Sequence, residues 1–156
     1  MMGLHVDEIP VTYTPTGGWV DEMPAPVLTD CATPLVEGAV DMAGMWHVVE
    51  VLVNGSADPT HPLLGAAQRI EQAGDRVIIT SGGIVHDMRC DGTVERGVRD
   101  VAAIDKTTPI SVVATYEDGV HVLRPVGLPV EIRRWREGEH LMWEYVGFVA
   151  RLERAS

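Results

Sequence analysis

The sequence predicts an all-β fold, an antiparallel up-and-down β-barrel of about eight to ten strands. Three observations carry this prediction. From residue 44 onward, runs rich in β-branched and apolar residues alternate with polar positions, Asn-Gly and Asp-Gly turn signals separate these runs, and no helix of crossover length lies between them. Because parallel strands require long crossover connections, a parallel sheet is excluded.

The turn signals define the expected strands. The first strand runs from Trp46 to Val53 and ends at Asn54-Gly55. A single short helical stretch is expected at Pro62–Ala67. The other strands are expected at residues 68–72, 76–80, 84–90, 93–101, 110–116, 120–124, 130–136 and 140–154, the last one broken near Val146-Gly147. A meander of this length leaves two exposed edges unless it closes, which favours a barrel.

Residues 1–43 differ from the rest of the chain because they contain five of its ten prolines. Proline excludes helix interiors, so this segment is expected to be an extended arm. Its apolar side chains, Trp19 among them, indicate that the arm packs on the barrel of residues 44–156 rather than acting as a free linker. Val11-Thr12-Tyr13 is a candidate short edge strand within the arm.

Charge and cysteine content exclude several classes of function. Twelve Lys and Arg stand against 23 Asp and Glu, a formal net charge of −11, which disfavours nucleic acid and anionic membranes as partners. Two cysteines, Cys31 and Cys90, form neither a disulfide framework nor a zinc motif, and no phosphate-binding loop is found. We expect no cofactor, no membrane insertion and a cytoplasmic location, and a homodimer is left open.

Several strands are partly apolar on both faces, as a barrel with an inner ligand cavity requires. Six residues are candidates for contact with the ligand: His86, Tyr116, Arg124, Trp143, Tyr145 and Arg151. Each has a structural alternative. His86 can be an ordinary core or surface histidine, and Arg124 either pairs with Glu131 in solvent or points inward toward an anionic group.

Two further clusters are given structural interpretations. Arg133-Arg134-Trp135-Arg136 is expected to face outward, neutralised by nearby glutamates. His86, Met88 and Cys90 share one strand face, but no third ligand at a recognisable spacing supports a metal site.

Two motifs resemble the calycin superfamily, which contains the lipocalins and the fatty-acid-binding proteins. Gly44-Met45-Trp46 is similar to its Gly-x-Trp signature, and residues 141–154 resemble the last hairpin of the fatty-acid-binding branch. That branch commonly ends in Arg-x-Tyr, which holds a ligand carboxylate. The resemblance places Arg151 at the arginine, whereas Glu153 replaces the tyrosine. Trp46 is expected to close one end of the barrel against an arginine such as Arg151.

The leading functional hypothesis is binding of one small hydrophobic molecule inside the barrel, such as an acyl chain or a similar lipid or polyketide-like compound. The alternative is an enzyme on the same barrel, a cyclase or isomerase that folds a hydrophobic biosynthetic intermediate, with His86, Tyr116 or Glu144 transferring a proton. A third possibility is an interaction module whose interior is filled by its own side chains. The sequence alone does not decide whether the protein is an enzyme.

Overall fold

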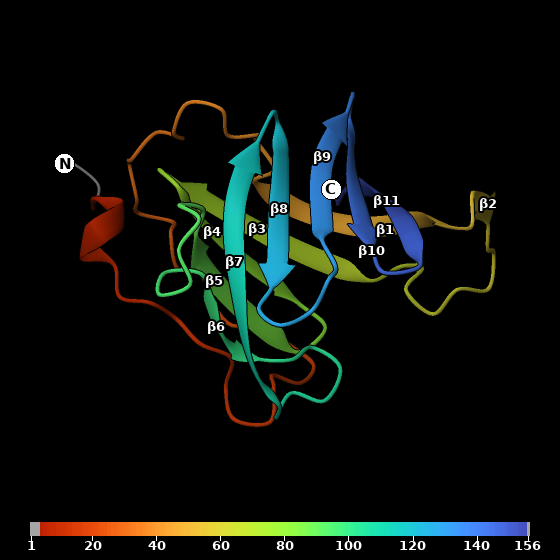
Figure 1. Ribbon diagram of the computed structural model, residues 1–156, viewed down its shortest axis with the longest axis horizontal. Coiled ribbons are helices and arrows are strands. Elements are labelled where there is room, and N and C mark those ends of the chain that lie inside the picture. The colour runs from red at the N-terminus through yellow and green to blue at the C-terminus, as the bar shows by residue number, and fades with distance from the viewer. Residues whose placement is uncertain (1–3, 156) are drawn as a thin grey trace.

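The computed structural model describes residues 4–155 as one antiparallel sheet curled into a nearly closed barrel (Figure 1). Ten strands form its wall, and a short extra strand, β2, pairs with the end of β1. The strands are β1 (Gly44–Val53), β2 (Ser56–Ala57), β3 (Ala67–Ala73), β4 (Arg76–Ser81), β5 (Ile84–Arg89), β6 (Val98–Val101), β7 (Pro109–Glu117), β8 (Val120–Pro125), β9 (Ile132–Glu137), β10 (His140–Tyr145) and β11 (Phe148–Arg154). The predicted fold class is therefore confirmed.

The first and last long strands meet, which closes most of the wall. β1 pairs with β3 on one side and with β11 on the other, where Trp46 lies opposite Arg154. Hydrogen-bonded neighbours follow in the order β5, β4, β3, β1, β11, β10, β9, β8, β7, β6. In Figure 1, β7, β8 and β9 lie in front of β1, β3 and β4. Among residues 4–155 no ladder joins β5 to β6, so the wall has one seam there.

Two tight turns form where Asn-Gly and Asp-Gly predict them. Asn54 and Gly55 have φ values of 52° and 81°, and Asp118 and Gly119 have 51° and 78°. Two successive positive φ angles are the requirement of a type I′ turn, whose twist matches that of the flanking strands. These turns set the register of the hairpins on either side.

The connections after β1 and β5 differ from the prediction. Residues 62–67 form no helix, because Gly65 adopts a φ of 84° and the loop is tied to β1 by hydrogen bonds from Gly65 N to Val48 O and from Val48 N to Ala66 O. The expected strand at 93–101 shrinks to β6. Asp91-Gly92 makes no tight hairpin, because Gly92 N bonds to Ala114 O on β7 instead.

Apolar side chains line the barrel interior, and Trp46 closes one end of it. Trp46 is fully buried and its Nε1 donates to Met42 O at 2.9 Å. The guanidinium groups of Arg154 and Arg136 lie 4.4 and 5.3 Å from its ring centroid. The expected packing of Trp46 against an arginine of the last strands is confirmed, but the example named, Arg151, is wrong, since Arg151 points away from the interior and pairs with Glu50 at 3.0 Å.

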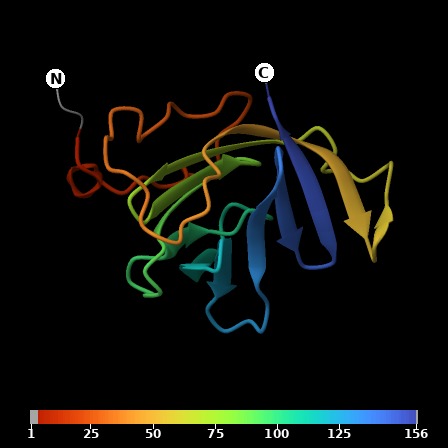
Figure 2. The ribbon, with the colours of Figure 1, turned by 90° about the horizontal axis from the view of Figure 1, so that it is seen from above.

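The described part of the proline-rich segment, residues 4–43, runs along the outer face of β3, β4 and β5 (Figure 2). A second apolar cluster forms beneath it, separate from the barrel interior, from Val6, Leu28, Ala73, Ile78 and Val85. Glu71 on β3 accepts hydrogen bonds from the backbone N–H groups of Val27 and Leu28, both at 2.8 Å. Residues 11–13 are not a strand; the backbone N–H of Thr12 donates to the Asp87 side chain rather than to a neighbouring strand.

Within residues 4–155, every helical segment is too short to cross a membrane.

Candidate functional site

A row of polar side chains crosses the inside of the barrel on three neighbouring strands. His121 on β8 lies directly opposite Arg134 on β9, and Arg134 lies opposite Trp143 on β10. Directly paired positions on one face of a sheet bring side chains into contact. Gln68 on β3 reaches the row from the other wall, and its Oε1 accepts a hydrogen bond from Arg134 Nη2 at 3.4 Å. We call these four residues the polar row.

The polar row is buried but its nitrogens are poorly satisfied. Arg134 is 4% exposed and His121 is fully buried. Among the described residues, Arg134 Nε, Trp143 Nε1 and both ring nitrogens of His121 have no hydrogen-bond partner. A buried polar group without a partner costs about 1–3 kcal/mol, so four such atoms together are not explained by stability. They are suited to binding a group that the chain itself does not provide.

The charge of the row is set by burial. Burial lowers the pKa of the Arg134 guanidinium to about 9, which still leaves it charged at neutral pH. Within residues 4–155 no carboxylate pairs with it. Burial, together with the positive charge of Arg134, lowers the pKa of His121 to about 3. His121 is therefore neutral and offers one donor and one acceptor beside a cation.

An aromatic cluster extends from the polar row toward the rim of the barrel. The Trp143 ring lies 5.0 Å below the Arg134 guanidinium and meets Phe148 edge-on, with ring centroids 5.4 Å apart. Tyr145 stacks on Phe148 with ring centroids 5.7 Å apart, and the His61 ring also packs against Phe148, at 5.3 Å. Tyr145 is 42% exposed, so the cluster leads from a buried cation to solvent. We call these rings the aromatic track.

A second interior group lies between β3, β5 and β7. Tyr116 accepts a hydrogen bond from Gln72 Nε2 at 2.8 Å and lies beside the Cys90 thiol. Burial raises the pKa of both Tyr116 and Cys90 far above their ordinary values. A protonated phenol and a protonated thiol bind and pack, but neither is a ready nucleophile or base at neutral pH.

The structure brings four of the six predicted residues to the interior or its rim. Trp143 belongs to the polar row, Tyr145 to the aromatic track, and Tyr116 to the second group. His86 points inward on β5, where its Nε2 lies 2.8 Å from Val101 O, and burial lowers its pKa.

The two predicted arginines lie on the outer surface. Arg124 Nε donates to Glu131 at 2.7 Å and its Nη2 to Glu117 at 3.0 Å, so it already has two carboxylate partners. Arg151 pairs with Glu50. The placement of both residues at the ligand is therefore corrected, because an outward arginine with a carboxylate partner cannot reach an interior guest. The solvent-facing alternative for Arg124 is the one observed.

The polar row contains residues that the sequence prediction missed. The basic run was expected to face outward as a unit, but a strand alternates its faces. Arg133 and Trp135 do face outward and bond to Glu131 and Glu137, whereas Arg134 faces inward. The available signal was Ile132, whose apolar side chain marks the inner face and places Arg134 on it two residues later. His121 and Gln68 carried no comparable signal.

Other sites are not evident in the described part of the chain. No three or more His, Cys, Asp or Glu side chains gather in a metal-binding arrangement among residues 4–155. Two hollows open on the outside of the barrel. One, of about 530 Å³, lies between the arm and the seam, and the other, of about 550 Å³, is a shallow depression beside Arg124 and Val130.

Comparison with known proteins identifies the type of barrel. No protein-family model matches the sequence, and neither does any curated protein. Among solved structures the chain resembles human cRBP IV, with a TM-score of 0.50 and 16% sequence identity over 74% of this chain and 99% of that one. Human cRBP IV has the fatty-acid-binding-protein type of calycin fold. The likeness establishes that this chain has the same ten-stranded antiparallel architecture.

Proposed function

We propose that this calycin-type barrel binds one small molecule with an apolar body and an anionic, hydrogen-bond-accepting end. The observation that carries the proposal is Arg134, a buried cation without a carboxylate partner in the described chain. An uncompensated buried charge costs several kcal/mol, and an anionic guest would offset that cost. The matched structure is by name a retinol-binding protein, which supports an apolar guest.

Each part of the interior has a role in this proposal. The guest's anionic end accepts hydrogen bonds from Arg134 and from Trp143 Nε1, and neutral His121 donates one more from a ring N–H. Its apolar body lies against the aromatic track, including the stacked rings of Phe148 and Tyr145. An acyl chain ending in a carboxylate has both properties.

Catalysis is less well supported than binding. A cyclase or isomerase needs a group that exchanges protons near neutral pH. Of the groups suggested for proton transfer, burial holds Tyr116 in its protonated form and lowers the pKa of His86. Burial also lowers the pKa of the neighbouring His121 to about 3, so that it remains neutral. These groups suit recognition rather than proton transfer.

Titration of the protein with palmitate and with cetyl alcohol, followed by tryptophan fluorescence, tests the proposal. The wild type is expected to bind palmitate saturably and more tightly than the alcohol. Arg134→Met should weaken palmitate binding by about 10- to 150-fold, the value of a charge-assisted hydrogen bond, and should leave alcohol binding nearly unchanged. Arg133→Met, on the outer face of the same strand, is the matched control and should bind as the wild type does.

Two results would contradict the proposal. One is undiminished palmitate binding by Arg134→Met, which would remove Arg134 from the site. The other is the absence of saturable binding of either compound by the wild type.

A further inference from the structure

The seam between β5 and β6 is the weakest part of the barrel wall. Ladder hydrogen bonds join all the remaining pairs of neighbouring strands in the wall. Across the seam, the described residues supply a hydrogen bond from Arg89 N to Arg96 O at 2.7 Å and a contact between His86 Nε2 and Val101 O at 2.8 Å. Strand pairs held by so few bonds open at lower free energy than paired ones.

Residues 10–14 of the arm, which we call the strap, cross this seam on the outside. Thr12 N donates to Asp87 Oδ2 on β5 at 3.0 Å, and Thr14 N donates to Asp100 Oδ2 on β6 at 2.9 Å. The Thr14 hydroxyl also accepts from Val85 N at 2.9 Å and donates to Val85 O at 3.2 Å. The strap therefore connects the two strands that the sheet leaves unpaired.

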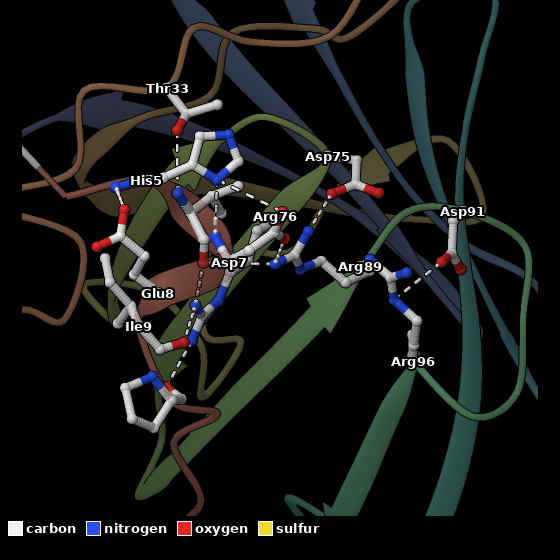
Figure 3. Close-up of polar contacts among 12 residues, drawn as sticks. His5, Asp7, Glu8, Ile9, Thr33, Asp75, Arg76, Arg89, Asp91 and Arg96 are labelled. Atoms are coloured by element: carbon white, nitrogen blue, oxygen red, sulfur yellow. Dashed lines mark hydrogen bonds and ion pairs between the residues drawn. The ribbon is translucent and has the colours of Figure 1, made fainter.

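The β5 side of the strap is firmly anchored by Arg76. This arginine is 1% exposed and bonds to both carboxylate oxygens of Asp87, at 2.9 and 2.6 Å. Its remaining N–H groups donate to the carbonyl oxygens of Val6, Ile9 and Pro10, at 2.7–3.2 Å (Figure 3). On the β6 side, the described residues of the strap make one hydrogen bond, from Thr14 N to Asp100. Opening is therefore expected on the β6 side.

The hollow beside the strap leads toward the barrel interior. It has a volume of about 530 Å³ and is lined by strap residues, by Asp100 and by Met88. Met88 is buried and belongs to the interior apolar cluster, so its side chain separates the floor of the hollow from the barrel interior. His86 lies on the inner side of the same seam, close enough to Arg134 that the guanidinium charge contributes to lowering the pKa of its imidazole.

We propose that the strap holds the seam closed, and that its release from Asp100 opens a lateral path between the outer hollow and the polar row. The path rests on the proposed function, because it carries a guest to Arg134. The closing of the seam does not depend on any guest and is tested separately.

The test compares Asp100→Ala with Glu95→Ala in the full chain. Glu95 lines the same hollow and carries the same charge, but it makes no contact with the strap among the described bonds. Amide hydrogen exchange of residues 84–101, measured by mass spectrometry, reports opening of the seam. Asp100→Ala should raise exchange there about 10- to 150-fold, as expected for loss of one charge-assisted hydrogen bond, while Glu95→Ala should not. Asp100→Asn keeps one acceptor oxygen and should give a smaller increase, which provides a second variant if the alanine protein is unstable.

Stopped-flow binding of anilinonaphthalene sulfonate tests the path. A gate changes passage in both directions, so Asp100→Ala should raise the association and dissociation rates by the same factor and leave Kd unchanged within about twofold. Equal hydrogen exchange in Asp100→Ala and Glu95→Ala would refute the proposal that the strap holds the seam closed. Faster exchange with unchanged probe rates would overturn the path. A wild-type protein that binds no probe would contradict both the proposed function and the lateral path. Hydrogen exchange would then still test whether the strap holds the seam closed.

Discussion

Replacing Arg134 by methionine is expected to make the unliganded protein more stable, although it removes a buried side chain that bonds to Gln68 and stacks on Trp143. Methionine has a similar length and no charge, so it fills the same interior space without a desolvated cation. An arginine retained for stability would give the opposite result. The sign of the change therefore separates a structural role from a binding role.

The magnitude follows from the environment of Arg134. Burial lowers its pKa from 12.5 to about 9, and at about 1.4 kcal/mol per pKa unit this corresponds to roughly 5 kcal/mol. The substitution gives up a desolvated cation–π contact with Trp143, about 2 kcal/mol, and leaves Gln68 Oε1 unpaired, about 1 kcal/mol. The expected net gain is about 2 kcal/mol in the free energy of unfolding, or a rise in Tm of about 4–8 °C.

Urea denaturation at neutral pH, without added ligand, measures this gain. Arg133→Met is the control, because Arg133 lies on the solvent-facing side of the same strand and bonds to Glu131; its effect should stay below about 1 kcal/mol. A decrease in the unfolding free energy of Arg134→Met would refute the reasoning. It would mean that the protein itself already compensates the guanidinium.

Two further predictions concern buried polar groups. His121 has a folded-state pKa of about 3 against an ordinary 6.5, so below pH 6.5 the unfolded chain binds a proton that the folded chain excludes. Stability should therefore fall as the pH is lowered through this window, and the wild type should lose about 2 kcal/mol more than His121→Phe between pH 7 and pH 5, measured by urea denaturation. Asp87→Ala should cost about 3–5 kcal/mol because it leaves Arg76 buried without a carboxylate. Arg89→Ala should cost less, about 1–2 kcal/mol, because its carboxylate partners Asp7 and Asp75 are 65% and 24% exposed. Equal losses in thermal unfolding would contradict this difference.

The strands could be predicted from the sequence because the signals for strands and turns lie in neighbouring residues. Asn54-Gly55 and Asp118-Gly119 can adopt successive positive φ angles, and both form the turns expected of them. Gly44-Met45-Trp46 placed Trp46 at a closed end of the barrel. The loop at residues 62–67 was misread because its backbone groups bond to β1, and that competition is invisible in a local helix signal.

The candidate site was only partly predictable, because it depends on which strand face is inside. Trp143 and Tyr116 were identified as large side chains on alternating strands. Arg124 was also placed on an apolar face, yet Glu117 and Glu131 lie within reach on the outside and bind it there. Arg134 was assigned to an outward basic run, although Ile132 indicated its true face. The alternation of side chains along a strand therefore predicts which face a residue occupies better than its place in a run of charged residues does.

Two arginines of this protein are almost equally buried, and the contrast between them carries the functional argument. Arg76 uses all five of its N–H groups on protein oxygens, two of them from Asp87, so burial there ties the arm to the barrel. Arg134 has one long bond to Gln68 and no carboxylate within the described chain. Burial alone therefore does not distinguish a structural charge from a binding charge. The set of partners does distinguish them: Arg134 has no carboxylate partner among the described residues, and this difference is the basis for the proposed anionic guest.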